Sequence, residues 1–194
     1  METEIKFRIR DLSALPPLLR RCGFREETPR TKEVNELYDL PGQALRKRGA
    51  LLRLRQYGER WVLTYKEGRP KPEERHKSRR EIETVIAEGS AMEGILQALG
   101  YEVIFRYEKF RSEWSDGVGH VVIDETPIGN FAEIEGSPEW IDATAARLGV
   151  SPGEYITRSY ADLWFRWKEE TGSRARHMTF AEVANPAKAE WLHG

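Results

Sequence analysis

The sequence has a single cysteine, no long apolar run and almost no net charge, and each absence excludes a class of protein. With only Cys22 in 194 residues, a disulfide framework within the chain is excluded and a reducing compartment fits. No run is apolar enough to span a bilayer, and the charged first residues lack a signal-peptide pattern. Lys plus Arg number 31 and Asp plus Glu 32, which argues against a nucleic-acid or membrane partner. We therefore expect a cytoplasmic protein.

The chain is instead rich in charge of both signs. Charged residues make up 32% and hydrophobic residues 39%, against a usual charged share of about a quarter. The length suits one substantial domain, which we place at residues 1–172. Residues 173–194 are expected to form a C-terminal tail with at most a short helix.

The first ten residues alternate between charged and apolar side chains, which predicts a β-strand with two different faces. The charged face carries Glu2, Glu4, Lys6, Arg8 and Arg10. The opposite face carries Thr3, Ile5, Phe7 and Ile9. By itself this pattern is typical of a strand with one face in solvent.

Later segments repeat the same alternation. Strands are predicted at residues 24–40, 50–57, 60–67, 77–87, 101–115, 119–125 and 130–136. Helices are predicted near residues 11–22 and 90–99 and from Ser137 onward. Two sheets could leave all the charged faces in solvent. A closed barrel would turn them into its lumen, so the predicted fold is α+β, a closed eight-stranded antiparallel β-barrel with helices packed outside.

The charged side chains come as pairs of one sign, two residues apart. The carboxylates are Glu2 and Glu4, Glu81 and Glu83, Glu133 and Glu135, with Asp124 in addition. The cations are Lys6, Arg53 and Arg55, Lys66, Arg79, and Lys109 and Arg111. Like charges in a lumen are costly unless the carboxylates hold a divalent metal and the cations hold a polyanion. Oxygen ligands suit Mg²⁺ or Mn²⁺, and Arg and Lys suit phosphate.

Residues 2–6, Glu-Thr-Glu-Ile-Lys, match the ExExK signature of the CYTH superfamily, the triphosphate tunnel metalloenzymes. That family includes class IV adenylyl cyclase and thiamine triphosphatase. The same order of charged strand motifs follows along the chain, so the resemblance covers about residues 1–165. It implies an eight-stranded antiparallel tunnel that binds a triphosphate-containing small molecule and one or two divalent cations, Mg²⁺ or Mn²⁺.

The resemblance also implies roles for individual residues. Phosphate-binding residues would be Lys6, Arg53, Arg55, Lys66, Arg79, Lys109 and Arg111. First-choice metal ligands would be Glu2, Glu4, Glu133 and Glu135, with Glu81, Glu83 and Asp124 as further ligands or water holders. Tyr38 and Lys66 would form a catalytic dyad that orients water.

Two reactions use the same charged apparatus. We expect hydrolysis of inorganic triphosphate, thiamine triphosphate or a nucleoside triphosphate. Cyclisation of ATP to cyclic AMP and pyrophosphate is the alternative, and a non-catalytic polyphosphate or nucleotide sensor is the second. The sequence leaves a homodimer open.

Overall fold

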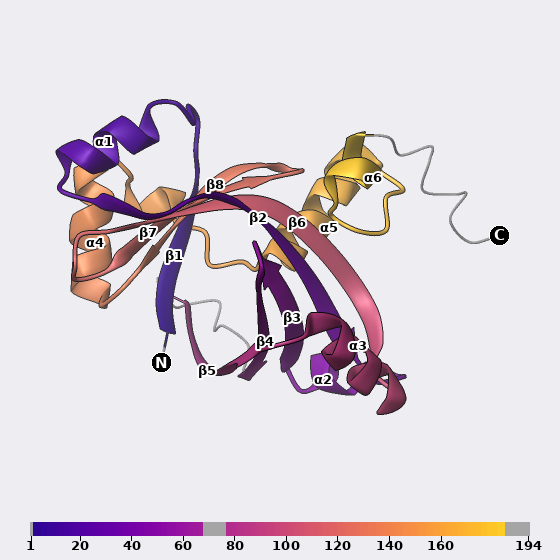
Figure 1. Ribbon diagram of the computed structural model, residues 1–194. Helices are drawn as coiled ribbons and strands as arrows, with labels where there is room; N and C mark the ends of the chain where they lie inside the picture. Colours follow the sequence, from indigo (N-terminus) through magenta and orange to yellow (C-terminus); the bar gives the residue numbers. More distant parts are fainter. Residues whose placement is uncertain (1, 68–76, 185–194) are drawn as a thin grey trace.

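The computed structural model describes residues 2–67 and 77–184; the predicted loop at 68–76 and Trp191 lie outside this part. In the described residues an eight-stranded antiparallel sheet is accompanied by six α-helices (Figure 1). The strands are β1 (Glu2–Arg8), β2 (Arg25–Asp39), β3 (Leu51–Tyr57), β4 (Arg60–Glu67), β5 (Lys77–Ile86), β6 (Glu102–Ser115), β7 (His120–Thr126) and β8 (Gly129–Glu135). The helices are α1 (Leu15–Arg21), α2 (Ala44–Lys47), α3 (Gly89–Ala98), α4 (Pro138–Arg147), α5 (Tyr160–Thr171) and α6 (Phe180–Ala184), with a 3₁₀ turn at Pro152–Glu154.

The strands follow the order β1-β5-β4-β3-β2-β6-β7-β8. The long strand β2 pairs with both β3 and β6, so it joins the two halves of the sheet. β1 pairs with β8 over five residue pairs, but with β5 over only three. The α+β class and the eight antiparallel strands are therefore confirmed. The short β1–β5 contact does not confirm the closed barrel.

The two faces of β1 are buried against different partners. Ile5 and Phe7 pack with Leu19 and Ile141 from α1 and α4, in a core on the outer face of the sheet. Lys6, on the opposite face, is only 2% exposed. Glu4 and Lys6 of the charged face are therefore buried, whereas Arg8 at the end of β1 is exposed.

Helix α5 is placed differently from α1 and α4. Its residues Tyr160, Leu163 and Trp164 pack with Leu37 of β2 and Tyr107 of β6. Leu37 and Tyr107 belong to the inner face of the sheet, because both also line the charged cavity described below. The helix thus contacts the inner face, whereas the sequence predicted helices only on the outside.

Helix α3 departs from its predicted start. We expected Ser90 and Glu93 to form a capping box, but the helix begins at Gly89 and its N-cap Glu88 makes no side-chain cap hydrogen bond. A Cβ at Gly89 would lie 2.1 Å from the Trp61 ring, so the helix start is fitted against that ring. At the other end, Leu99, which we expected to point inward, is the C-cap and is 65% exposed.

The segment after α5 packs against β6 at Met178. Met178 is fully buried, and its backbone pairs with β6 through bonds to Arg106 and Glu108. Thr179 caps α6 by accepting from the Glu182 amide, as the sequence predicted. The domain boundary at residue 172 stays a prediction. None of the helices described here combines the length and the apolar character that crossing a bilayer requires.

Candidate active site

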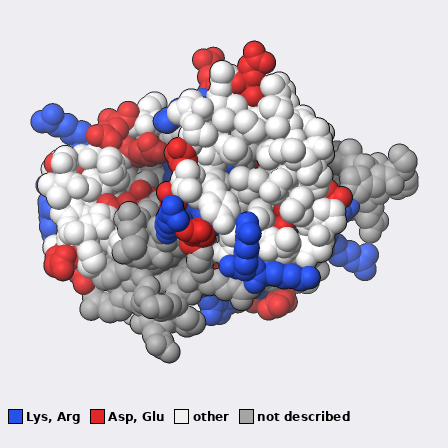
Figure 2. All heavy atoms as spheres, turned by 90° about the horizontal axis from the view of Figure 1, so that it is seen from below, with Lys and Arg blue, Asp and Glu red and all other residues white. Residues whose placement is uncertain are grey.

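A cavity of about 500 Å³ lies on the inner face of the sheet, and all eight strands contribute side chains to it. Because side chains alternate along a strand, residues two apart project into the same cavity. On the face of the molecule shown in Figure 2, charged groups of both signs lie close together toward the middle and left. Acidic and basic side chains therefore line the same cavity. A net charge near zero is consistent with such a site, because the two kinds of charge cancel.

One side of this cavity is a network of buried ion pairs, which we call the buried wall: Lys6, Lys109, Arg111, Asp124 and Glu133. Lys6 Nζ donates to Glu133 Oε1, and Arg111 Nη2 donates to Glu133 Oε2 over 2.5 Å. Arg111 also binds Asp124 through two bonds of 2.7 and 2.6 Å. Lys109 Nζ adds a bond of 2.9 Å to the same carboxylate.

The charges of the buried wall stabilise one another. Burial opposes ionisation of Glu133, but Lys6, Arg111 and Lys109 outweigh it and hold the pKa of Glu133 well below its usual range. Burial likewise acts to lower the pKa of Lys6, and the Glu133 and Glu4 charges overcome it and raise that pKa. Both groups are therefore charged at neutral pH, and each depends on its partners to remain so.

Glu33 of β2 lies behind these cations, a role that sequence reasoning missed. It is fully buried, and its carboxylate lies 3.3 Å from Lys109 Nζ and 3.7 Å from Arg111 Nε. Asn35 Nδ2 donates to Glu33 Oε1 over 2.8 Å. Burial opposes the charge, but the neighbouring cations lower the pKa of Glu33 to about 2. The only signal in the sequence for its inward position is strand alternation, which places Glu33 and Asn35 on the same face of β2 as Leu37.

Tyr160 was also missed, because the sequence placed it in an apolar stripe of α5. Its hydroxyl donates to Asp124 Oδ2 over 2.6 Å. Its ring lies 4.4 Å from Lys6 Nζ and 5.0 Å from Lys109 Nζ, measured to the centroid. The first residue of α5 therefore belongs to the buried wall as well as to the core.

The opposite side of the cavity, the open wall, consists of Arg53, Arg55, Lys66, Glu81 and Glu83 from β3, β4 and β5. Lys66 Nζ lies 2.8 Å from Glu81 Oε2, but the Arg53 contacts to Glu81 and Glu83 are 3.9 Å. The Nε atoms of Arg53 and Arg55 are buried without a hydrogen-bond partner. Each of these two guanidinium groups therefore has one N–H that no described acceptor satisfies.

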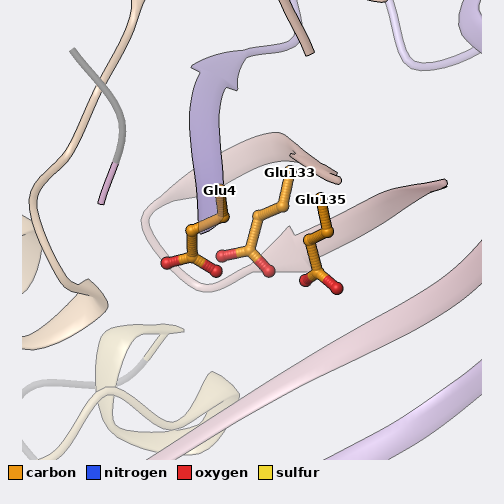
Figure 3. A group of neighbouring side chains, drawn as sticks. All are labelled: Glu4, Glu133 and Glu135. Carbon is orange, nitrogen blue, oxygen red and sulfur yellow. The ribbon is translucent and has the colours of Figure 1, made fainter. Parts of the chain in front are cut away.

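Three carboxylates form a candidate metal centre. Glu4 of β1 and Glu133 and Glu135 of β8 offer oxygen atoms that all lie within 4.8 Å of one another. Figure 3 shows their carboxyl groups side by side and pointing in the same direction. The pairing of Glu4 with Glu135 across the two strands brings them together. Oxygen donors at this spacing fit Mg²⁺ or Mn²⁺, although both Glu133 oxygens already accept bonds from cations.

Other predicted metal ligands are engaged elsewhere. Asp124 is fully buried and its oxygens bind Lys109, Arg111 and Tyr160, so it is a counter-charge for the cations and not a member of the metal cluster. Glu81 and Glu83 belong to the open wall and pair with its cations. The side chains of Glu2 and Arg79 lie outside the described part; their backbones pair, Glu2 of β1 opposite Arg79 of β5.

The structure does not bring the two residues of the predicted Tyr38–Lys66 dyad together. Lys66 lines the cavity, but Tyr38 is 1% exposed and packs with Leu54 and Leu96 beneath α3. Its hydroxyl donates to Glu36 Oε2 over 2.6 Å. Tyr38 follows Leu37, which lines the cavity, so strand alternation turns the Tyr38 side chain to the outer face.

Comparison with known proteins agrees with this geometry. A family model described as the CYTH domain matches residues 1–160. The chain belongs to the CYTH family. No curated protein matches the chain, so the family assignment carries no specific activity with it.

Solved structures share the CYTH fold over most of their length. A candidate adenylate cyclase of Vibrio parahaemolyticus is 24% identical, with a TM-score of 0.74 over 84% of this chain and 97% of its own. A conserved protein of Pyrococcus furiosus is 26% identical, with a TM-score of 0.67 over 84% and 99%. A candidate adenylyl cyclase of Hippeastrum, described as having a dominant triphosphatase activity, is 22% identical, with a TM-score of 0.64 over 86% and 96%.

Proposed function

We propose that this CYTH protein is a divalent-metal-dependent phosphohydrolase acting on a small molecule that carries a triphosphate. The observation that carries the proposal is the convergence of six cations and a three-carboxylate cluster on one cavity. A chain of phosphates needs cations along its length and a metal at one point. Phosphoryl transfer depends on such positioning and charge neutralisation more than on covalent help from the protein.

Each wall has a separate part in this function. Arg53, Arg55 and Lys66 of the open wall bind phosphate oxygens, because the carboxylates that they contact, Glu81 and Glu83, are partly exposed and can be exchanged for phosphate. Lys6, Lys109 and Arg111 supply positive charge from the buried wall and hold the far side of the phosphate chain. Arg79, in the adjacent strand, stays a proposed contact.

Glu4, Glu133 and Glu135 would hold Mg²⁺ or Mn²⁺, with Glu2 as a further proposed ligand. The metal, when bound, supplies Lewis acidity and lowers the pKa of a water molecule. The protein's own part is to fix the carboxylates, and the bonds from Lys6 and Arg111 do this for Glu133.

The site forms a tunnel in this proposal, closed where β1 meets β5. The inward burial of Lys6 and Glu133 supports closure, because charges on an open sheet would be exposed to solvent. The three residue pairs between β1 and β5 provide the contact.

Hydrolysis is preferred over cyclisation because it needs only water beyond the charged walls. The triphosphatase activity described for the Hippeastrum protein is compatible with hydrolysis on this fold. Adenylyl cyclase activity is the second candidate, and one observation favours it. Leu37, Leu51 and Tyr107 line the same cavity and would offer an apolar surface to a nucleoside.

The deciding experiment incubates the purified protein with inorganic triphosphate, thiamine triphosphate or ATP, each with Mg²⁺, with Mn²⁺ or with EDTA. Metal-dependent release of orthophosphate is the expected result. Cyclic AMP with pyrophosphate from ATP would replace the hydrolase with the cyclase. Tight binding of a triphosphate without turnover, whether Mg²⁺ or Mn²⁺ is present, would identify a sensor and overturn both enzymatic functions.

A further inference from the structure

A second cavity, which we call the α5 groove, has a volume of about 470 Å³. Its lining includes Arg8, Tyr155, Arg158, Arg166, Trp167 and Glu170. None of these residues lines the charged cavity. Arg8 ends β1, Tyr155 and Arg158 precede α5, and the others share one face of that helix through their spacing of three and four residues.

Positive charge is in excess in the α5 groove. Arg166 Nε donates to Glu170 Oε1 over 2.7 Å, so this pair is satisfied. Arg8 lies over the Phe131 ring, 4.9 Å from its centroid, a contact that leaves the guanidinium N–H groups available. Within residues 2–67 and 77–184 neither Arg8 nor Arg158 has a carboxylate partner. Two exposed arginines of this kind in one groove fit a phosphate group.

The groove also has aromatic walls that are fixed from behind. The Trp167 ring stacks on Trp164, with centroids 5.1 Å apart and an interplanar angle of 15°. Trp164 is buried in the core and holds Trp167 in place. The Tyr155 hydroxyl donates to Asp142 of α4 over 3.1 Å, which anchors the second ring. Rings that are fixed in this way bind a flat ligand with little loss of side-chain entropy.

The combination of arginine and aromatic lining narrows the ligand. An inorganic anion would use the arginines and leave the rings unused, and an acidic peptide would not need a flat surface. The volume lies within the range of pockets for small molecules, about 300–1,000 Å³. A ligand that carries both a phosphate and a planar ring would contact the arginines and the aromatic rings together.

We propose that the α5 groove is a binding site for a nucleoside monophosphate. Its phosphate contacts Arg8 and Arg158, and its base lies against Trp167. This site is separate from the triphosphate cavity and does not depend on the reaction performed there. Residues 155–161 connect the two, since Ile156 exchanges backbone hydrogen bonds with Lys6 and Ser159 lines the charged cavity.

The test is calorimetric titration of the full chain with AMP in the absence of divalent metal. Four proteins are compared: the wild type, the groove variant Arg8→Gln/Arg158→Gln, the cavity variant Arg53→Gln/Lys66→Gln, and Arg21→Gln as a control on α1. We expect the groove variant to bind AMP roughly tenfold or more weakly, because two charge-assisted contacts are lost. The cavity variant and the control are expected to bind like the wild type. Both groove arginines are exposed, so thermal unfolding of that variant should match the wild type.

Inorganic phosphate and adenosine are titrated as separate probes, and each is expected to bind more weakly than AMP. Equal binding of phosphate and AMP would overturn recognition of the ring. Loss of AMP binding in the cavity variant alone would place AMP in the triphosphate site and overturn the proposal. Unchanged binding in the groove variant would do the same. Phosphate release from triphosphate substrates is measured on all four proteins, so that failure of the groove is distinguished from failure of the hydrolase.

Discussion

The two walls of the charged cavity have similar residue types but very different surroundings. On the buried wall, the Lys109 and Asp124 side chains are 3% and 0% exposed, and the bond between them is 2.9 Å. On the open wall, the Glu83 side chain is 34% exposed and lies 3.9 Å from Arg53. The ion pairs of the buried wall are therefore short and excluded from solvent, whereas those of the open wall are more exposed and, apart from the Lys66–Glu81 pair, longer.

This difference separates two requirements of a polyanion site. Buried charges are expensive to remove from water and are tolerated only when they are fully paired, so the buried wall is a fixed framework. Partly exposed pairs are weak and exchange one partner for another at little cost. In the proposed function, the open wall can exchange its carboxylates for phosphate oxygens, while the buried wall keeps the proposed metal ligand Glu133 in place.

The largest expected effect comes from the carboxylate that joins the framework to the metal centre. In Glu133→Gln, metal-dependent turnover should fall to background, and unfolding in urea should show a loss of about 3–5 kcal/mol because Lys6 and Arg111 lose a buried partner. Glu4→Gln provides the matched test, with the same loss of turnover but a smaller loss of stability. Full activity in both variants would show that the metal lies elsewhere.

Asp124→Asn tests the framework without changing the metal cluster. Its oxygens serve Lys109, Arg111 and Tyr160, so the free energy of unfolding should fall by about 3–5 kcal/mol. On the open wall, Glu83→Gln should cost only about 0–1 kcal/mol. Both values come from urea denaturation. Equal losses in the two variants would remove the distinction between the walls.

Glu33 makes the buried wall sensitive to acid. Its folded pKa of about 2 lies below the unfolded value of 4.5, so its contribution to stability is complete above about pH 4.5 and is lost as the pH falls toward 2. The size is roughly 3 kcal/mol, at about 1.36 kcal/mol per pKa unit. Glu33→Gln should flatten the stability profile over that pH range, as measured by urea denaturation at each pH. A profile identical to wild type would contradict the assignment.

The open wall should affect substrate binding more than stability. Lys66→Gln removes one cation that pairs with Glu81, and we expect KM for the triphosphate to rise roughly tenfold from the loss of one charge-assisted contact. Thermal unfolding should change little. Steady-state kinetics separates the two, because a fall in kcat at constant KM would make Lys66 a catalytic residue and not a binding residue.

The smallest effect on turnover is expected outside the cavity. Tyr38→Phe removes a hydrogen bond to Glu36 on the outer face, which costs about 1 kcal/mol of stability. Because Tyr38 lies beneath α3, its removal should leave kcat and KM unchanged. A large fall in kcat with normal folding would restore the dyad with Lys66.

Strand alternation was enough to predict that several of the charged side chains line one cavity. Lys6, Lys109, Arg111 and Glu133 all occupy predicted strands, and their shared parity brought them to one cavity. The period of two contains the necessary information because a shift of one residue would move every side chain of a strand to the other face. The same information identified Glu4 and Glu135, whose strands pair directly.

The sequence could not supply contacts that depend on the packing between elements. In β2, apolar side chains occur on both faces, and the resemblance that implied a role for Tyr38 did not reveal that this side chain packs beneath α3. Tyr160 belongs to an apolar helical stripe, and only the position of α5 against β6 brings its hydroxyl to Asp124. The sequence does not distinguish Glu33 from the other acidic residues of β2, because only the fold brings four cations close to it.

The short contact between β1 and β5 has a mechanical consequence. A sheet parts first where the fewest backbone hydrogen bonds hold neighbouring strands, and three residue pairs hold this one. Glu4 also pairs with Glu135 on the other side of β1. Separation of β1 from β5 would leave Glu4 paired with Glu135, so the three carboxylates would keep their spacing.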